Sequence, residues 1–255
     1  MKEFSELYET ISFLRSEKGC PWDKKQTVKS LKKYLIEELY ELLDAIECDN
    51  IDEIIEEIGD LLLNLIMITV ILEQEQKTSI KEILFRLNKK IIERHSHVFE
   101  NKEIKTHTEV SKNWEIHKRI KEGKKIFNTI PKNAPALQKA YMMSKKADKI
   151  GFGFSSIEEV QNKVHEEVKE LNNAINIKER SHIEHELGDV LISIATLGLY
   201  LDINPEIALQ KACKRFMRRF EYIETELEKL GKNIFETSRE EIEKLWEESK
   251  LKINI

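Results

Sequence analysis

Acidic residues form two short motifs, and each motif occurs twice in the 255-residue chain. An EExxE motif begins at Glu37 and recurs at Glu166, and an ExxD motif begins at Glu57 and recurs at Glu186. The separation is 129 residues in both cases. A Glu-rich helix could produce one such match by chance, but two matches in fixed register indicate a duplicated domain.

The spacing within each motif places two carboxylates on one side of a helix. At about 100° per residue, Glu38 falls within an apolar arc and Glu41 at its edge, whereas Glu37 points away. The other motifs repeat this arrangement. The carboxylates expected to face a core are Glu38, Glu41, Glu57 and Asp60 in the first copy and Glu167, Glu170, Glu186 and Asp189 in the second.

Carboxylates that face a core need a compensating charge. Burying one ionised carboxylate without a partner costs several kcal/mol, and four together repel one another. An oxygen-only cluster suits a hard divalent cation, Mg²⁺ or Mn²⁺. Because Mg²⁺ also binds substrate phosphates, the clusters suggest phosphoryl chemistry. The alternative is a solvated acidic face, which is the ordinary meaning of a single EExxE motif.

Basic residues could bind a polyphosphate opposite these carboxylates. Lys90 and Arg94 are spaced i,i+4 on an expected helix, and Arg215 and Arg219 have the same spacing in the second copy. Such pairs can contact phosphates, although a solvated helix face has the same pattern. Trp246, near the end of the second copy, could stack on a base or pack in a core.

Two histidines, His182 and His185, precede Glu186 by four residues and one residue. They suggest metal ligands, but the first copy has no counterpart, so we do not assign them to the metal set.

Turn-forming residues are scarce, with 8 Gly and 4 Pro. This composition favours long helices and disfavours sandwiches, barrels and Gly-rich phosphate loops. Capping pairs such as Ser79 with Glu82 and Ser181 with Glu184 mark helix starts. We expect an all-α fold with helices at about residues 2–17, 28–48, 51–75, 79–95, 108–121, 135–149, 156–177, 180–201, 204–230 and 238–250.

The duplication divides the chain. A segment rich in Lys, Asn, Pro and Gly at residues 121–135 indicates a linker. We expect one domain at residues 1–120 and a second at 136–255. The apolar run at residues 61–72 is too short to span a bilayer. Because it covers more than one helix face, it predicts a tight homodimer.

Net charge and cysteine content indicate which partners and which cellular compartment to expect. The 42 Lys and Arg against 47 Asp and Glu give a net charge of −5, which argues against direct binding of nucleic acid. The 3 cysteines are far apart and form no CxxC motif. With no signal-peptide pattern at the N-terminus, these features predict a cytoplasmic protein without membrane attachment.

Further motifs accompany the acidic ones. The segments GCPWDKKQT at residues 19–27 and RHSHVF at 94–99 resemble MazG-type nucleoside triphosphate pyrophosphohydrolases. The second copy is similar to their second domain through KIGF at 149–152, ELGD at 186–189 and ALQKA at 208–212. The resemblance spans about residues 4–250. It implies duplicated helical domains whose four-helix-bundle-like units assemble in a homodimer.

The resemblance also implies Mg²⁺-dependent cleavage of a nucleoside triphosphate between its α- and β-phosphates, giving a nucleoside monophosphate and pyrophosphate. The eight carboxylates above would hold the metal, and Glu37, Glu166 or one of the ligands could orient the attacking water. The family often carries Asn where Thr196 and Cys213 stand. The implied nucleotide-binding residues are Lys163, Arg215, Arg219 and Trp246, with Lys90 and Arg94 in the first copy.

Two alternatives stay open. One is a relative restricted to dUTP or phosphoribosyl-ATP, and the other is a helical interaction protein with a decayed site. The intact carboxylates in both copies argue against the second alternative. We expect the second copy to dominate turnover because it has the denser basic set, Lys163, Lys211, Lys214, Arg215, Arg218 and Arg219.

Overall fold

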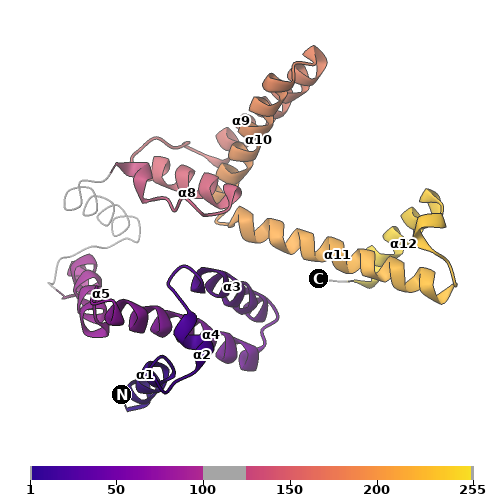
Figure 1. The fold of residues 1–255 in the computed structure, drawn as a ribbon. Coiled ribbons are helices and arrows are strands. Elements are labelled where there is room, and N and C mark those ends of the chain that lie inside the picture. The colour runs from indigo at the N-terminus through magenta and orange to yellow at the C-terminus, as the bar shows by residue number, and fades with distance from the viewer. Residues whose placement is uncertain (1, 100–124, 254–255) are drawn as a thin grey trace. The chain divides into compact units, whose positions relative to one another are not determined.

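The computed structural model describes residues 2–99 and 125–253, and the prediction of an all-α fold is confirmed (Figure 1). No strand occurs among the described residues. The chain divides into two compact units, Met1–Glu103 and Ile104–Ile255. The helix expected at 108–121 lies outside the described residues, as does the start of the expected linker.

The first unit is built around a helical hairpin. In its described part, α3 and α4 pack against each other and α1 packs on α4. The apolar segment 61–72 lies in α4 and supplies most of the buried core, which also receives Ile11 from α1 and Leu31 from α3. The helices of this unit are α1 (Lys2–Leu14), α2 (Pro21–Lys25), α3 (Leu31–Glu47), α4 (Ile51–Gln74), α5 (Ile80–Arg94) and α6 (Ser96–Phe99).

The second unit repeats the hairpin. Here α9 packs along α10, α8 packs on α10, and α12 packs on α11. Three small side chains, Val160, Ala174 and Ala195, are fully buried and allow the helices to approach closely. The elements are η1 (Ile126–Thr129), α8 (Ala136–Lys149), α9 (Ile157–Ile177), α10 (Arg180–Tyr200), α11 (Pro205–Lys229), η2 (Ile234–Glu236) and α12 (Arg239–Lys252).

Equivalent turns connect the two acidic helices of each hairpin. Asp49 follows α3 with φ of 50°, and Lys178 follows α9 with φ of 62°. These residues are 129 positions apart, so the left-handed turn is duplicated together with the motifs. The expected cap at Ser181 is wrong: α10 already begins at Arg180, and Ser181 donates its hydroxyl to the carboxylate of Glu179.

None of the described helices combines the length and the hydropathy needed to cross a membrane.

Candidate active site

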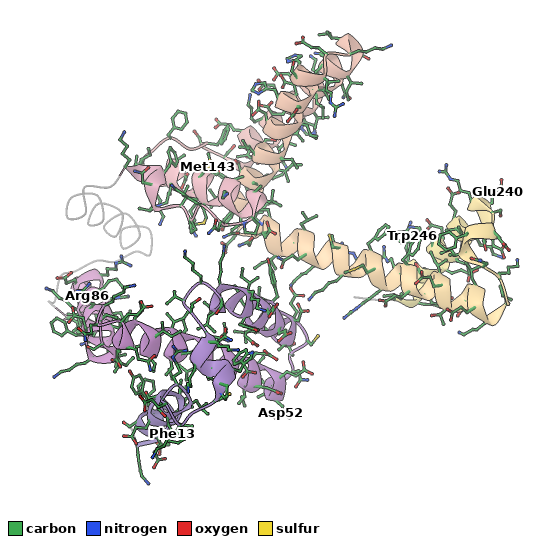
Figure 2. All side chains as sticks on the ribbon, viewed as in Figure 1. Phe13, Asp52, Arg86, Met143, Glu240 and Trp246 are labelled. Atoms are coloured by element: carbon green, nitrogen blue, oxygen red, sulfur yellow. The ribbon has the colours of Figure 1, made fainter. Side chains whose placement is uncertain are left out.

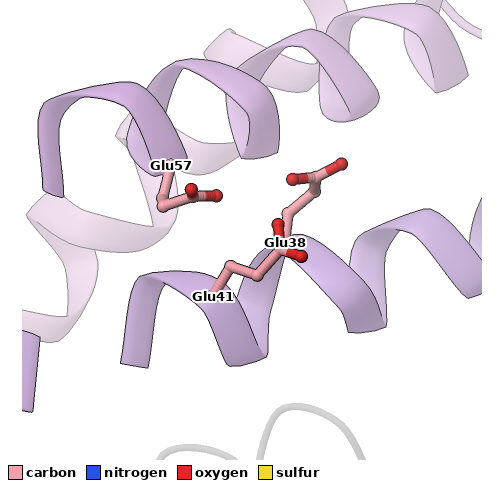
Figure 3. Close-up of side chains that lie close together, drawn as sticks. All are labelled: Glu38, Glu41 and Glu57. Atoms are coloured by element: carbon pink, nitrogen blue, oxygen red, sulfur yellow. The ribbon is translucent and has the colours of Figure 1, made fainter. Parts of the chain in front are cut away.

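The α3–α4 hairpin brings three glutamates of the first copy together. Carboxylate oxygens of Glu38, Glu41 and Glu57, one from each side chain, all lie within 4.8 Å of one another. Figure 3 shows the carboxylates of Glu38 and Glu41 from α3 and of Glu57 from α4 in the space between the two helices. The helical-wheel placement of these three residues therefore corresponds to a real cluster, formed where the acidic turns of both helices meet.

The α9–α10 hairpin makes the equivalent cluster from Glu167, Glu186 and Asp189, again within 4.8 Å. Glu167 and Glu186 are each only 6 % exposed. Each cluster holds three of the four expected carboxylates. The fourth is Asp60 in the first copy, and it is Glu170, which is exposed, in the second.

Among the described residues, the first cluster has no recorded basic partner for its negative charge. Partial burial raises the pKa of Glu38, and the charges of Asp60, Glu41 and Glu57 raise it further. Burial also raises the pKa of Glu57, as do the charges of Glu41 and Asp60. The Oε2 atom of Glu57 is buried without a hydrogen-bond partner. An orphaned buried acceptor inside an all-oxygen donor set fits a hard divalent cation.

The second cluster instead carries its own basic partners. The Nζ atom of Lys163 lies 2.9 Å from Oε1 of Glu166 and 2.8 Å from Oε1 of Glu167. These hydrogen bonds raise the pKa of the Lys163 ammonium. Lys163 thus balances part of the charge of a buried carboxylate.

Histidines lie beside the other two carboxylates of that cluster. The Nδ1 atom of His182 is 3.5 Å from Oε1 of Glu186, and the Nε2 atom of His185 is 3.4 Å from Oδ2 of Asp189. These imidazoles contact the carboxylates from the preceding helical turn. If the carboxylates hold a metal, such contacts would orient them as ligands.

The first copy lacks all three basic partners. The positions equivalent to Lys163, His182 and His185, displaced by 129 residues, hold Tyr34, Glu53 and Glu56. The two glutamates add negative charge near Glu57. The duplicated motifs therefore share their geometry but differ in charge balance.

A cavity of about 160 Å³ opens beside the second cluster. Its charged side is formed by Lys163, Glu167 and Asp189. The remaining wall is apolar or hydroxyl-bearing and consists of Phe154, Val160, Ile192, Ser193 and Thr196. One end of the cavity can therefore take a metal-bound anion, and the other can take an uncharged group.

The expected phosphate-binding arginines lie on α11 and do not line this cavity. The guanidinium carbon of Arg219 is 5.8 Å from the ring centroid of Trp246, and its Nε atom is buried without a hydrogen-bond partner. Trp246, which is labelled in Figure 2, also packs against Phe216, with ring centroids 5.0 Å apart. Arg215 is half-buried on the same helix.

The basic pair of the first copy, Lys90 and Arg94, lies on α5. This helix follows the C-terminal end of α4, whereas Glu57 lies near its N-terminal end. The 24 residues of α4 span about 36 Å. The charges that raise the pKa values of Glu38 and Glu57 come from neighbouring carboxylates, and neither residue of this pair is among them.

Sequence reasoning did not identify the cavity wall. Ser193 and Thr196 follow Asp189 at i+4 and i+7, and helical spacing alone places them on the same face as this carboxylate. No comparable signal exists for Phe154, because it lies in the α8–α9 loop.

Comparison with known proteins adds a family assignment to this geometry. The family model described as the MazG nucleotide pyrophosphohydrolase domain matches twice, at residues 26–99 and 155–223. Both ranges contain an EExxE and an ExxD motif.

Relatives match the chain over nearly its whole length. A nucleoside triphosphate pyrophosphohydrolase/pyrophosphatase MazG of Thermotoga maritima is 39 % identical over 250 residues, covering 97 % of this chain and 95 % of the relative. A nucleoside triphosphate pyrophosphohydrolase of Escherichia coli K12 is 32 % identical, with 98 % of both chains covered. YabN of Bacillus subtilis, named as uncharacterized, is 38 % identical over 97 % of this chain and 52 % of its own length.

Proposed function

This chain belongs to the MazG nucleotide pyrophosphohydrolase family, and we propose that it uses a divalent metal to cleave nucleoside triphosphates between the α- and β-phosphates. Water adds to phosphorus as the α–β bridging bond breaks, so the products are a nucleoside monophosphate and pyrophosphate. The observation that carries the proposal is the recurrence of one carboxylate cluster inside both family-matched ranges.

The carboxylates would hold Mg²⁺, with Mn²⁺ as an equivalent. A metal bound there would neutralise charge on the phosphate oxygens during cleavage. The orphaned Oε2 atom of Glu57 and the oxygen-only donor sets support this choice of ion. The proposed ligands are Glu38, Glu41, Glu57 and Asp60, and Glu167, Glu170, Glu186 and Asp189.

The remaining residues of the second site have separate roles. Lys163 can exchange its bond to Glu167 for one to a phosphate oxygen, because both partners are anionic acceptors. Glu166 is exposed and hydrogen-bonded to Lys163, which leaves one carboxylate oxygen to orient a water molecule. Glu37 holds the equivalent position in the first copy.

Arg215, Arg219 and Trp246 are the proposed contacts to the leaving pyrophosphate and to the nucleoside. The unpartnered Nε atom of Arg219 supports a role in binding an acceptor group. Because these residues do not line the cavity, this role requires that α11 of the same chain or of a partner copy meets the substrate there. Lys90 and Arg94 are proposed to act likewise for the first copy.

We propose a homodimer. Both hairpins expose apolar side chains at equivalent positions, which an isolated unit leaves in water. An interface that covers these faces on each hairpin accounts for their repetition. The equivalent pairs are Leu39 with Val168, Ile46 with Ile175, Ile58 with Leu187, and Leu65 with Ile194.

The setting we propose is the cytoplasm, without nucleic-acid partners. The three cysteines are free, which suits a reducing compartment, and the chain is net acidic.

The test is a panel of canonical and modified nucleoside triphosphates incubated with and without Mg²⁺, with products separated by ion exchange. We expect monophosphate and pyrophosphate in the presence of Mg²⁺ only. Diphosphate and orthophosphate as products would overturn the cleavage position. Turnover of dUTP or phosphoribosyl-ATP alone would replace the broad substrate class with a narrow one.

A further inference from the structure

The last residue of α10, Tyr200, joins three segments of the second unit. Its hydroxyl oxygen lies 3.0 Å from Oδ1 of Asp148 on α8 and 2.9 Å from the carbonyl oxygen of Phe154. The backbone N–H of Phe154 also donates to this oxygen. One hydroxyl can donate once and accept twice, so Tyr200 bonds both α8 and the α8–α9 loop.

Gly153 is required for this contact. A Cβ atom at residue 153 would lie 2.3 Å from Oδ1 of Asp148 and 2.8 Å from the hydroxyl oxygen of Tyr200. Any other residue would therefore force Asp148, Tyr200 or the loop to shift and would disturb their contact. We call Asp148, Gly153 and Tyr200 the loop clamp.

The clamp determines where Phe154 lies. The rings of Phe154 and Tyr200 meet edge to face, with centroids 6.2 Å apart. Phe154 in turn lines the same cavity whose charged side is formed by Lys163, Glu167 and Asp189. The clamp therefore links the C-terminal end of α10 to the aromatic wall beside the carboxylate cluster.

The residues of the clamp are not repeated at the equivalent positions of the first copy, where Tyr8 of α1 instead donates its hydroxyl to the carboxylate of Glu73 on α4. The positions displaced by 129 residues from Asp148, Phe154 and Tyr200 hold Gly19, Lys25 and Ile71. None of these three side chains can reproduce a hydroxyl–carboxylate bond or an aromatic wall.

The chemistry of the cavity assigns its two ends. A triphosphate is fully charged and belongs with the metal cluster and Lys163. The wall of Phe154, Val160 and Ile192 suits a flat apolar ring instead. The hydroxyl of Ser193 donates to the carbonyl of Val190, which leaves its oxygen lone pairs as acceptors for a polar ring edge.

We propose that Tyr200 is a positioning residue that holds Phe154 against the nucleobase of the substrate. This inference rests on the proposed function and adds a nucleobase contact at Phe154 to the nucleoside contact proposed for Trp246. The clamp affects substrate binding and not the cleavage step at phosphorus. The carboxylate cluster lies on α9 and α10 and does not include the α8–α9 loop that the clamp holds.

The test compares Tyr200→Phe with Tyr141→Phe, which removes a tyrosine hydroxyl from α8 outside the cavity wall. For Tyr200→Phe we expect KM for a nucleoside triphosphate to rise about fivefold and kcat to stay within about twofold. Inhibition by inorganic tripolyphosphate, which has no nucleoside, should not change. Tyr141→Phe should behave as the unaltered enzyme.

A second variant keeps the test decisive if Tyr200→Phe does not fold. Phe154→Ala shortens an exposed loop side chain and should give the same rise in KM with unchanged tripolyphosphate inhibition. An unchanged KM in Phe154→Ala, or an equal loss of tripolyphosphate binding, would overturn the inference while leaving the proposed function intact. An unaltered enzyme that cleaves no nucleoside triphosphate would instead overturn the function.

Discussion

The ammonium nitrogen of Lys163 lies 2.8 Å from Oε1 of Glu167, one helical turn away on α9. The equivalent pair in the first copy is Tyr34 and Glu38, which cannot form an ion pair. The second carboxylate cluster therefore contains its own cation, whereas in the described part of the chain no equivalent cation accompanies the first. The different charge balance of the two copies leads to the first four predictions.

Replacing Lys163 by Met should destabilise the second unit. Glu167 would stay buried without its ammonium partner, at a cost of about 1–2 kcal/mol after allowance for the partial exposure of Lys163. Urea unfolding followed by circular dichroism measures this loss, and added Mg²⁺ should recover part of it. Lys169→Met removes an exposed lysine from the same helix and should leave stability unchanged.

Matched substitutions should show which copy turns over substrate. Glu38→Gln and Glu167→Gln remove one carboxylate at equivalent positions. We expect Glu167→Gln to lower kcat at least about 100-fold, since a metal ligand is lost. We expect Glu38→Gln to retain more than about half of the kcat of the unaltered enzyme. Steady-state release of pyrophosphate measures both. The opposite ranking would assign turnover to the first copy.

Acidification should stabilise the first unit when no divalent cation is present. The pKa values of Glu38 and Glu57 are raised in the folded chain, so the folded state retains these protons to higher pH than the unfolded state. Their contribution to stability is full below the ordinary glutamate pKa and is lost as pH rises through the raised values. The melting temperatures of the unaltered chain and of Glu57→Gln are measured across this pH range in the presence of a chelator. The difference between the two melting temperatures isolates the effect of the Glu57 carboxyl. A difference that does not change with pH would contradict it.

The first cluster should bind a divalent cation without nucleotide more readily than the second. No described basic side chain competes for its carboxylates, whereas Lys163, His182 and His185 contact those of the second. Titration of Mn²⁺ followed by electron paramagnetic resonance should show a tight site that Glu57→Gln removes. If Glu186→Gln removes it instead, the assignment is reversed.

The exposed apolar faces should hold two chains together. Light scattering at micromolar concentration should give twice the 30.1 kDa chain mass. Leu65→Asp together with Ile194→Asp should reduce this toward one chain, because charges would enter an apolar interface. Phe235→Asp changes an exposed residue outside the hairpins and should have no effect.

Sequence periodicity was sufficient to predict the long described helices and the helix faces that carry the acidic motifs. The acidic motifs sit on long amphipathic helices, so their faces could be derived from spacing alone. The five-residue helix α2 was missed because it is too short to show a period. Which carboxylate of each quartet lies outside the cluster depends on how the two helices cross, and a helical wheel does not contain that information.

The loop clamp could not be anticipated for a different reason. Asp148, Gly153 and Tyr200 belong to separate elements and meet only through tertiary packing. Likewise, the partners of Arg219 depend on how α12 folds back on α11. Local pattern predicts the side chains on one helix face, and contacts between elements determine the rest.

Asp49 and Lys178 occupy the same left-handed backbone position in the two copies of the hairpin. The positive φ at this position is common to both hairpins, whereas its side chain is an acid in one copy and a base in the other. Both hairpins bring three carboxylates within 4.8 Å of one another, although the flanking positions hold Glu53 and Glu56 in one copy and His182 and His185 in the other. The same left-handed turn thus connects two hairpins whose acidic clusters have different electrostatic surroundings.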